Sequence, residues 1–306
     1  MDKLNFPNRI TVELTNKCNV SCTFCPRQSV DMKIGYMSTE LYKKIIDEAA
    51  KHLPVKLVIF FRGESLLHPN FIECVKYAKE RGIGPIQYAT NAFELSRELS
   101  DALLEAEIDF VSFSLDTIDK DVYRKSRLSG DLEKSMENVI YFCKKCDELR
   151  LQGRSVPTTQ VSTIEIDDYM PRQQEFIEFW QQYVDIVRVY YEHDDNGKFR
   201  SAEVQKEVEK QVPDRQPCRK VFTDLLVYWD GRCALCNYDW RGGLKGLNLN
   251  DMTISEAWNS EAYEQIRRDQ NGNTISDSSM CNNCQHWRID YMKDGHLGRI
   301  YRRDEQ

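Results

Sequence analysis

The chain has 306 residues, of which 41% are hydrophobic and 30% charged, and its net charge is −7 at pH 7. This acidic balance argues against a large phosphate-binding surface and therefore against a nucleic-acid substrate. No apolar run reaches the length of about 18 residues that indicates a membrane span, and residues 1–10 lack the basic and apolar parts of a signal peptide. We therefore expect a cytoplasmic protein with no membrane contact, whose eleven cysteines are free or bind metal.

Strand-like and helix-like segments alternate along the first two thirds of the chain. Short runs rich in β-branched and aromatic residues predict strands at 10–15, 55–61, 85–90, 110–115, 158–163 and 184–191. Apolar residues at helical spacing predict helices around 41–49, after Pro69, and from Leu132 to Leu149 behind an Asp131 cap. Repeated strand–helix units predict an α/β fold with parallel strands, either doubly wound or a barrel. In both, the loops at the carboxyl ends of the strands build the active site.

The alternation ends near residue 195, where the sequence becomes polar and charged and is closed by prolines. We predict three regions: a first domain over 1–195, a linker over 196–213 and a smaller domain over 214–306. The smaller domain is expected to contain a β-hairpin over 224–236, followed by an amphipathic helix over 253–268. Asp230 and Gly231 predict a two-residue hairpin turn, and Ile254, Ala257, Trp258 and Ile266 form the apolar face of the helix.

Three cysteines follow the first predicted strand in "CNVSCTFC", at Cys18, Cys22 and Cys25. A structural zinc ion takes four protein ligands, and an electron-transfer [4Fe–4S] cluster takes four cysteines. A local set of three therefore leaves one position open, and an open iron can bind a reactant. The alternative is a zinc loop that a distant fourth ligand completes.

This motif after a strand resembles the signature of the radical S-adenosylmethionine (SAM) enzymes. The resemblance implies that the three thiolates hold a [4Fe–4S] cluster whose fourth iron binds SAM. It also implies reductive cleavage of SAM to a 5′-deoxyadenosyl radical that abstracts a hydrogen atom from carbon. The fold it implies over 1–195 is a partial (β/α)6 TIM-like barrel. A flavodoxin or ferredoxin would supply the electron.

The resemblance also implies a set of SAM-contacting residues. Arg62, Gly63 and Glu64 in "FFRGES" resemble the family's glycine-glycine-glutamate motif, with arginine in place of the first glycine. The implied SAM contacts are Phe24, Gly63, Glu64, Thr90, Asn91, Ser112, Ser114 and Asp116. Taken alone, these residues are equally typical of turns and strand-end caps.

A second cysteine set lies in the smaller domain, at Cys218, Cys233, Cys236, Cys281 and Cys284. Such a set in a reducing compartment predicts a second metal site, for which zinc also fits. The pattern resembles the SPASM and shorter twitch extensions of radical SAM enzymes, in which a G-x4-C element precedes a later C-x2-C. That resemblance selects Cys218, Cys236, Cys281 and Cys284 as ligands of one auxiliary [4Fe–4S] cluster, able to carry electrons.

The spacing of these ligands resembles that of single-cluster enzymes of the 2-deoxy-scyllo-inosamine dehydrogenase type, which oxidise a secondary alcohol. Cys233 is left over from the ligand set. By resemblance to enzymes of the neomycin C epimerase type, its thiol is a candidate hydrogen-atom donor. The alternative is a small buried residue of the hairpin, since free cysteine packs as a hydrophobe.

Five other residues receive structural interpretations. Cys74, Cys143 and Cys146 fall on predicted helices, so we expect them to pack in the core instead of forming redox pairs. His68 is expected to cap or pack a loop. Arg188 in the sixth strand is either a substrate anchor or a partner in a surface ion pair.

We therefore predict a radical SAM oxidoreductase or epimerase. Its substrate would be a small hydroxylated metabolite of the sugar, aminocyclitol or aminoglycoside type. The short segment before Cys18 leaves no room for a leader-peptide domain, which disfavours peptide modification by Cα epimerisation or crosslinking. That activity remains the first alternative, and a non-catalytic iron–sulfur or zinc protein is the second.

Overall fold

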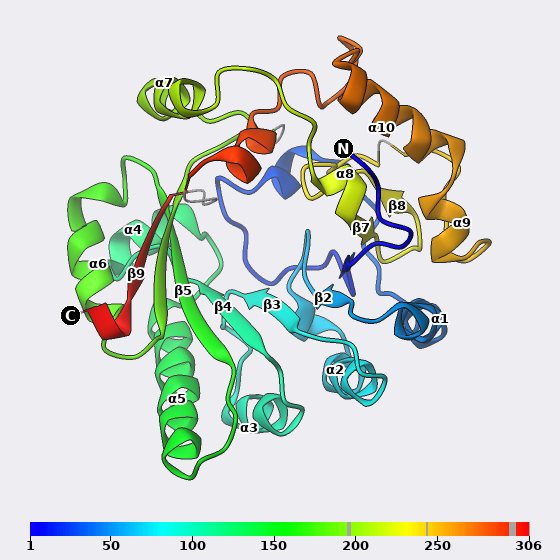
Figure 1. The fold of residues 1–306 in the computed structure, drawn as a ribbon. Helices are drawn as coiled ribbons and strands as arrows, with labels where there is room; N and C mark the ends of the chain where they lie inside the picture. The colour runs from blue at the N-terminus through cyan, green and yellow to red at the C-terminus, as the bar shows by residue number, and fades with distance from the viewer. Residues whose placement is uncertain (195–196, 243, 294–297, 306) are drawn as a thin grey trace.

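The computed structural model describes residues 1–194, 197–242, 244–293 and 298–305, and its core is one curved sheet with helices along its outer side (Figure 1). The strand order in this part of the chain is β8-β7-β1-β2-β3-β4-β5-β6-β9. The predicted boundary between the first domain and the linker, at 195–196, lies outside the described residues. Within the described ranges, no helix is both long and apolar enough to cross a lipid bilayer.

The six predicted strands are confirmed, with shifted ends. They are β1 Arg9–Val12, β2 Lys56–Val58, β3 Ile86–Thr90, β4 Phe110–Ser114, β5 Thr158–Glu165 and β6 Ile186–Tyr191. Each pairs in parallel with the next along the chain. The α/β class with parallel strands is therefore confirmed, and their carboxyl ends lie at one edge of the sheet.

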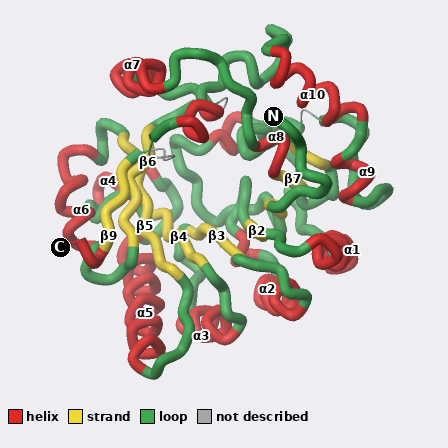
Figure 2. Tube along the Cα trace, in the orientation of Figure 1, coloured by secondary structure: helices red, strands yellow, loops and turns green. Residues whose placement is uncertain are grey.

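Six helices follow these strands and pack on one side of the sheet, as Figure 2 shows. They are α1 Thr39–Ala49, α2 Phe71–Glu80, α3 Arg97–Glu105, α4 Lys120–Ser126, α5 Leu132–Leu151 and α6 Gln173–Trp180. The predicted helices correspond to α1, α2 and α5. Asp131 caps α5 as expected, because its side chain accepts a hydrogen bond of 3.1 Å from the Lys134 backbone N–H.

The two faces of the sheet differ in polarity because side chains alternate along each strand. Toward the helices the sheet presents buried apolar residues such as Val12, Val111, Phe113, Val187 and Val189. The opposite face, which we call the lumen face, carries Thr11, Glu13, Val58, Ala89, Ser112, Ser114, Gln160, Ser162, Arg188 and Tyr190. The strand register aligns this set across neighbouring strands. The sheet therefore separates an apolar core on the helix side from a polar interior on the lumen side.

Strands from the predicted smaller domain extend the same sheet. β7 (Asp224–Val227) pairs in parallel with β1, and β8 (Cys233–Ala234) pairs antiparallel with β7. At the other edge, β9 (Arg299–Arg302) pairs antiparallel with β6. The hydrogen bonding of the sheet thus continues into the region predicted as a separate domain.

The predicted hairpin is present, but its turn is one residue longer than expected. Tyr228 N–H donates to the Arg232 carbonyl at 2.9 Å, which leaves Trp229, Asp230 and Gly231 as a three-residue turn. Gly231 has a φ of +88°, and a Cβ there would lie 2.5 Å from the Asn248 side chain. A three-residue loop with glycine in the left-handed region is the usual alternative to the two-residue turn.

The remaining helices differ from the prediction in two places. The expected single helix over 253–268 is two, α9 (Ile254–Trp258) and α10 (Glu261–Gly272), because Ser260 starts a new helix by accepting from Tyr263 N–H. The predicted linker contains α7 (Ala202–Gln211), followed by the short α8 (Lys220–Thr223). Further 3₁₀ turns are Pro26–Ser29, Ala50–His52, Ser65–Leu67, Met170–Arg172, His286–Tyr291 and Arg303–Glu305.

Candidate active site

The three-cysteine loop follows β1 at the carboxyl edge of the sheet and is fixed to the end of α4. Thr23 N–H donates to the Ser126 carbonyl at 2.8 Å, and Leu128 N–H donates to the Ser21 carbonyl at 3.1 Å. Cys18, Cys22 and Cys25 are all free thiols and half-buried. The loop is therefore held by backbone contacts that leave its thiols available as ligands.

Burial raises the pKa of all three thiols, and it raises the pKa of Cys22 to about 12. Arg127 counteracts this effect at Cys22, and Arg27 does so at Cys18 and Cys25. Metal binding requires thiolates, so cations that favour the charged form help the loop to take up metal. Arg127 lies more than 100 residues further along the chain, and nothing in the sequence indicates that it belongs to this site.

The segment around Gly63 packs directly against the cysteine loop. Glu64 N–H donates to the Lys17 carbonyl at 2.8 Å. A Cβ at position 63 would lie 2.6 Å from the same carbonyl and would also clash with the Thr15 carbonyl. Only glycine allows this approach, which explains the residue type at 63 independently of any cofactor.

The Glu64 carboxylate is buried and pre-oriented by backbone donors. Asn91 N–H donates to it at 2.9 Å and Leu66 N–H at 3.2 Å. Burial outweighs these bonds and raises the pKa of Glu64 to about 7. The structure therefore brings three predicted SAM contacts, Gly63, Glu64 and Asn91, together beside the cysteine loop.

Asp116 lies in a buried ion pair that the sequence did not predict. Arg127 donates from Nε to Asp116 Oδ2 at 2.8 Å and again from Nη2. Asp116 has a φ of +65°, and burial raises its pKa although Arg127 opposes the change. Because Arg127 also neighbours Cys22, the pair connects the end of β4 to the cysteine loop. The predicted contact between Asp116 and SAM stays a prediction.

The other predicted SAM contacts lie around the same edge. Thr90 is buried, and its hydroxyl accepts from Ala92 N–H at 3.0 Å, as expected of a strand-end cap. Ser112 accepts a hydrogen bond of 2.9 Å from Gln160 Nε2 on the lumen face. Ser114 is half-buried on that face, and the Phe24 ring packs edge-on against Tyr169. These positions are compatible with cofactor contact but do not test it.

The four predicted auxiliary ligands line one pocket: Cys218, Cys236, Cys281 and Cys284. Arg215 and Lys220 border it, and each favours the thiolate form of several of these cysteines. An iron–sulfur cluster with four thiolates is an anion, so flanking cations fit it. The donor set and its charge therefore fit a four-cysteine [4Fe–4S] cluster.

Arg215 and Gln270 organise the backbone of this pocket. Arg215 Nη1 donates to the carbonyls of Cys281 and Cys284 at 3.4 and 3.5 Å. The Gln270 side-chain oxygen accepts from Cys218 N–H at 3.0 Å and from Arg215 Nη2 at 3.2 Å. Sequence reasoning missed both residues, because neither belongs to the cysteine motif.

A site for one metal ion makes a different demand on side-chain positions than a four-iron cluster does. In the part of the chain that the structure describes, no group of three or more His, Cys, Asp or Glu side chains surrounds one point closely enough to hold a metal ion. One zinc ion holds its thiolates within about 4 Å of each other. A four-iron cluster imposes no such convergence, because each cysteine binds a different iron.

Cys233 lies apart from both cysteine sets. It is 0% exposed within the main hydrophobic core, and burial raises its pKa to about 12. It pairs with Val227, which in turn pairs with Val12, so its side chain lies on the helix-facing side of the sheet. This placement agrees with a packing role. The hydrogen-donor role stays a prediction.

Cys74, Cys143, Cys146 and His68 lie where we expected them, whereas Arg188 does not lie on the surface, so its surface ion-pair alternative is wrong. Cys74, Cys143 and Cys146 are buried in the core. His68 contacts the Met37 carbonyl through Nε2 at 2.9 Å and is buried in its loop. Arg188 is buried on the lumen face, with its guanidinium 5.0 Å from the centre of the Tyr190 ring, so it is not a surface residue.

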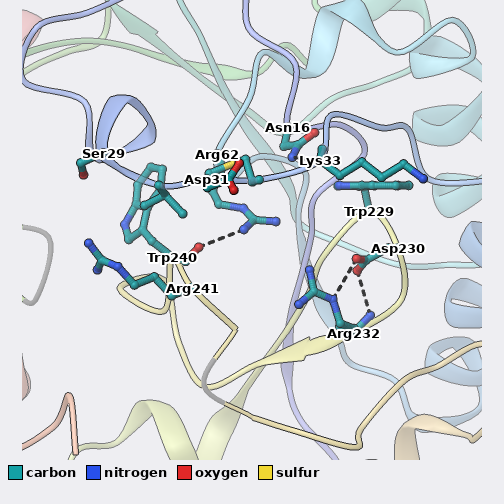
Figure 3. Close-up of a pocket in the computed structure, with 12 residues that line it drawn as sticks. Asn16, Ser29, Asp31, Lys33, Arg62, Trp229, Asp230, Arg232, Trp240 and Arg241 are labelled. Carbon is teal, nitrogen blue, oxygen red and sulfur yellow. Dashed lines mark hydrogen bonds and ion pairs between the residues drawn. The ribbon is translucent and has the colours of Figure 1, made fainter.

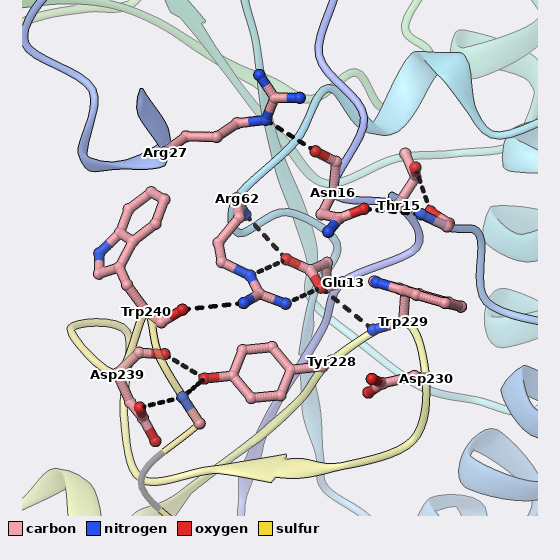
Figure 4. A network of polar contacts seen from close by, with 12 residues as sticks. Glu13, Thr15, Asn16, Arg27, Arg62, Tyr228, Trp229, Asp230, Asp239 and Trp240 are labelled. Atoms are coloured by element: carbon pink, nitrogen blue, oxygen red, sulfur yellow. Dashed lines mark hydrogen bonds and ion pairs between the residues drawn. The ribbon is translucent and has the colours of Figure 1, made fainter. Parts of the chain in front are cut away.

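Arg62, the departure from the expected glycine, forms a buried ion pair with Glu13 (Figure 4). Arg62 donates from Nε and from Nη2 to the two Glu13 carboxylate oxygens, each at 2.7 Å. Its Nη1 donates to the Trp240 carbonyl at 3.0 Å, and its guanidinium lies 3.9 Å from the centre of the Tyr228 ring. Glu13 also accepts from Trp229 N–H at 3.2 Å. This network ties the ends of β1 and β2 to the hairpin.

Comparison with known families agrees with this arrangement. A family model described as the radical SAM superfamily matches residues 12–151, and one described as the SPASM iron–sulfur cluster-binding domain matches residues 218–285. The chain carries a radical SAM domain and a SPASM domain. These domains imply [4Fe–4S] clusters with SAM as cofactor, and the matched ranges include both cysteine sets.

Curated relatives match only part of the chain. A tungsten-containing aldehyde ferredoxin oxidoreductase cofactor-modifying protein from Pyrococcus furiosus is 34% identical over 35% of the chain and 30% of its own length. A GTP 3′,8-cyclase from Chlorobaculum tepidum is 35% identical over 37% of the chain and 34% of its own length. The chain thus spans about a third of these relatives.

Solved structures match over nearly the whole chain. BtrN in complex with AdoMet (SAM) and 2-DOIA has a TM-score of 0.58 at 18% identity, covering 93% of this chain and 94% of that one. Streptococcus suis SuiB bound to the precursor peptide SuiA has a TM-score of 0.68 at 14% identity, covering 97% and 76%. At such identities the likeness shows the fold alone. The partial barrel with its C-terminal SPASM domain is confirmed.

Proposed function

We propose that this radical SAM protein oxidises a carbinol carbon of a small hydroxylated metabolite of the sugar, aminocyclitol or aminoglycoside type. The lumen face carries the proposal. Ser162 and Tyr190 offer hydroxyl groups there and Gln160 an amide, and such groups bind substrate hydroxyls as both donors and acceptors. Gln160 already contacts Ser112 at 2.9 Å and Tyr190 at 3.4 Å.

In this proposal Cys18, Cys22 and Cys25 hold the SAM-binding cluster. SAM bound beside these cysteines would supply 5′-deoxyadenosyl radical chemistry, which abstracts a hydrogen atom from carbon. Gly63 and Glu64 orient the SAM amino group. Phe24, Thr90, Asn91, Ser112, Ser114 and Asp116 contact the rest of the cofactor. A flavodoxin or ferredoxin delivers the electron.

The placement of Cys233 favours dehydrogenation over epimerisation. An epimerase must return a hydrogen atom to the substrate, whereas the Cys233 thiol is buried on the helix-facing side of the sheet. Dehydrogenation instead loses the hydroxyl proton and one further electron, giving a ketone. Cys218, Cys236, Cys281 and Cys284 would hold the auxiliary cluster that accepts this electron. The similarity to BtrN, whose structure contains 2-DOIA, supports the same assignment.

The test is SAM cleavage by the anaerobically reconstituted protein with a strong reductant and a panel of aminocyclitols and sugars. We expect 5′-deoxyadenosine to form, and an oxidised ketone product to appear in equal amount with one panel member. Deuterium at the carbinol carbon should appear in the 5′-deoxyadenosine. Absence of 5′-deoxyadenosine would reject the radical mechanism, and recovery of an epimer without a ketone would reject dehydrogenation.

Peptide modification is the second candidate, because solved neighbours bind peptides. SuiB is bound to a precursor peptide, and anSMEcpe, with AdoMet and the Cp18Cys peptide, has a TM-score of 0.62 and covers 95% of this chain. The same assay with peptides encoded beside the gene separates the candidates. Transfer of peptide Cα or Cβ deuterium into 5′-deoxyadenosine would favour this second function.

A further inference from the structure

A cavity of about 480 Å³ opens beside the cysteine loop (Figure 3). Its walls are Asn16, residues 29–33, Arg62 and parts of the segments 229–232 and 240–241. It therefore joins the loop that follows the cysteines to the hairpin of the SPASM domain. None of the residues predicted to bind SAM or metal lines it.

The chain path places this cavity close to both predicted cofactor sites. Asn16 is two residues from Cys18, and Arg62 is two residues from Glu64, so each backbone separation is at most about 7 Å. Trp240 follows Cys236 by four residues, which limits that separation to about 14 Å. A ligand in this cavity would therefore lie beside the SAM-binding edge and near the auxiliary cysteines.

The charges that line the cavity favour an anion. Among the described residues, its lining includes the cations Lys33, Arg62, Arg232 and Arg241 and the acids Asp31 and Asp230. The buried Glu13 neutralises Arg62, so four cations stand against three acids. Arg232 Nε already pairs with Asp230 Oδ2 at 2.8 Å, and its terminal nitrogens make no hydrogen bond to the residues that the structure describes. Lysine and arginine have no acceptor atoms, so a matching ligand must be rich in acceptors, as carboxylate and phosphate are. This excess of cations is local, because the chain as a whole carries −7.

Two indole rings flank the opening. In Figure 3, Trp229 and Trp240 lie on opposite sides, with Arg62 between them. The Trp229 ring packs directly against Gly35, because a Cβ at position 35 would lie 2.5 Å from the ring carbon Cε3. Fixed aromatic surfaces of this kind pack against the C–H face of a sugar or cyclitol ring. The cavity thus combines apolar walls with donor-only cations.

We propose that this cavity binds a carboxylate or phosphate group on the hydroxylated substrate, with Arg232 as the principal donor. The proposal rests on the function proposed above and restricts its substrate class to anionic sugars or cyclitols. Anchoring the anion here would leave the rest of the substrate beside the SAM-binding edge. Arg232 is exposed and pairs within its own turn, so replacing it spares the core.

Calorimetric titration of the cluster-loaded, SAM-bound protein tests this proposal with four related hexoses: glucuronate, glucose 6-phosphate, glucosamine and methyl glucoside. We expect saturable binding at millimolar concentration by glucuronate, glucose 6-phosphate or both, and weaker or no binding by the other two. Arg232→Gln should weaken anion binding about tenfold or more, as loss of a charged hydrogen bond predicts. Arg268→Gln, which changes another exposed arginine on α10, should bind as the parent does.

The carboxylate and phosphate arms identify which anion is bound. Equal or tighter binding of glucosamine or methyl glucoside would overturn the proposal, as would no binding by either anion or parent-like binding by Arg232→Gln. Saturable binding of an acidic peptide with no hexose bound would also overturn it. The readout requires no turnover. If 5′-deoxyadenosine and ketone form but the protein shows no preference for anionic hexoses, only the inference about this cavity fails. If anionic hexoses bind but no 5′-deoxyadenosine forms, the proposed reaction fails.

Discussion

Gly63 is the residue on which the fit between the SAM motif and the cysteine loop depends most directly. Gly63→Ala would place a Cβ 2.6 Å from the Lys17 carbonyl. The clashing atom belongs to the backbone, so no side-chain rotation can relieve the contact. We expect a loss of about 1–3 kcal/mol in unfolding free energy, because overpacked backbone has to shift. Urea denaturation measures this loss, and SAM affinity should fall with it.

Gly272→Ala is the matched control for Gly63→Ala. At Gly272 the nearest atom to a new Cβ is the Thr274 hydroxyl at 3.4 Å, and the backbone has no positive φ. We expect a change within about 0.5 kcal/mol. Equal destabilisation by the two substitutions would contradict the close-approach explanation.

Glu64 gives a pH-dependent prediction. Its carboxyl pKa is raised to about 7 by burial. In the proposed function a proton must therefore leave before the carboxylate can accept a hydrogen bond from the SAM amino group. SAM affinity should therefore rise about eightfold between about pH 6 and pH 7.5, as the ionised fraction grows. Equilibrium dialysis measures this, and Glu64→Gln should flatten the increase. A parallel rise in the variant would assign the effect to SAM itself.

Local spacing predicted part of the site, while long-range pairing could not be predicted. The cysteine triplet was predicted from its spacing, and Gly63-Glu64 from the resemblance of a short segment to a family motif. The ion pair between Arg127 and Asp116 joins residues on either side of a helix, and the pair between Arg62 and Glu13 joins the ends of two different strands. Side chains that pair across strands leave no periodic pattern in one sequence.

The junction between β1, β2 and the hairpin depends on the Arg62–Glu13 pair. Arg62→Met would leave Glu13, which is 0% exposed, without its charge partner. We expect a loss of about 3–5 kcal/mol in unfolding free energy, the typical effect of an uncompensated buried charge. Chemical denaturation provides the measurement.

The double variant Arg62→Met with Glu13→Gln separates charge pairing from packing. It removes both charges, so it should be more stable than Arg62→Met alone. Arg62→Lys keeps the charge but loses the two-pronged contact and the bond to Trp240, and should lie between parent and Arg62→Met. A double variant as unstable as Arg62→Met would indicate that packing against Tyr228 matters more than charge.

At the scale of elements, the sequence predicted strands better than it predicted helix ends and sheet edges. β-branched runs are dense enough to locate β1 to β6. α7 was missed because its sequence, AEVQKEVEKQ, is mostly polar and buries only Val208. The pairing of β7 with β1 depends on tertiary contact between segments more than 200 residues apart, which periodicity does not encode.

The proposed function divides the cysteines of the whole molecule into one open and one closed ligand set, and iron content tests this division. Cys236→Ser should lower the iron content of reconstituted protein from about eight to about four per chain, because it removes one of the four predicted auxiliary ligands. Cys233→Ser is the matched control: it lies three residues away on the same hairpin but is buried outside the cysteine pocket. It should keep about eight irons.

The same pair of variants separates radical formation from substrate oxidation. Cys236→Ser leaves Cys18, Cys22 and Cys25 intact, so SAM cleavage should persist in a reductant-driven assay while ketone formation stops. Iron analysis and electron paramagnetic resonance of the reduced protein report the two sites without turnover. If Cys233→Ser loses iron and Cys236→Ser does not, the predicted auxiliary ligand set is wrong. Cys233, which lies in the apolar core, would then be the iron ligand.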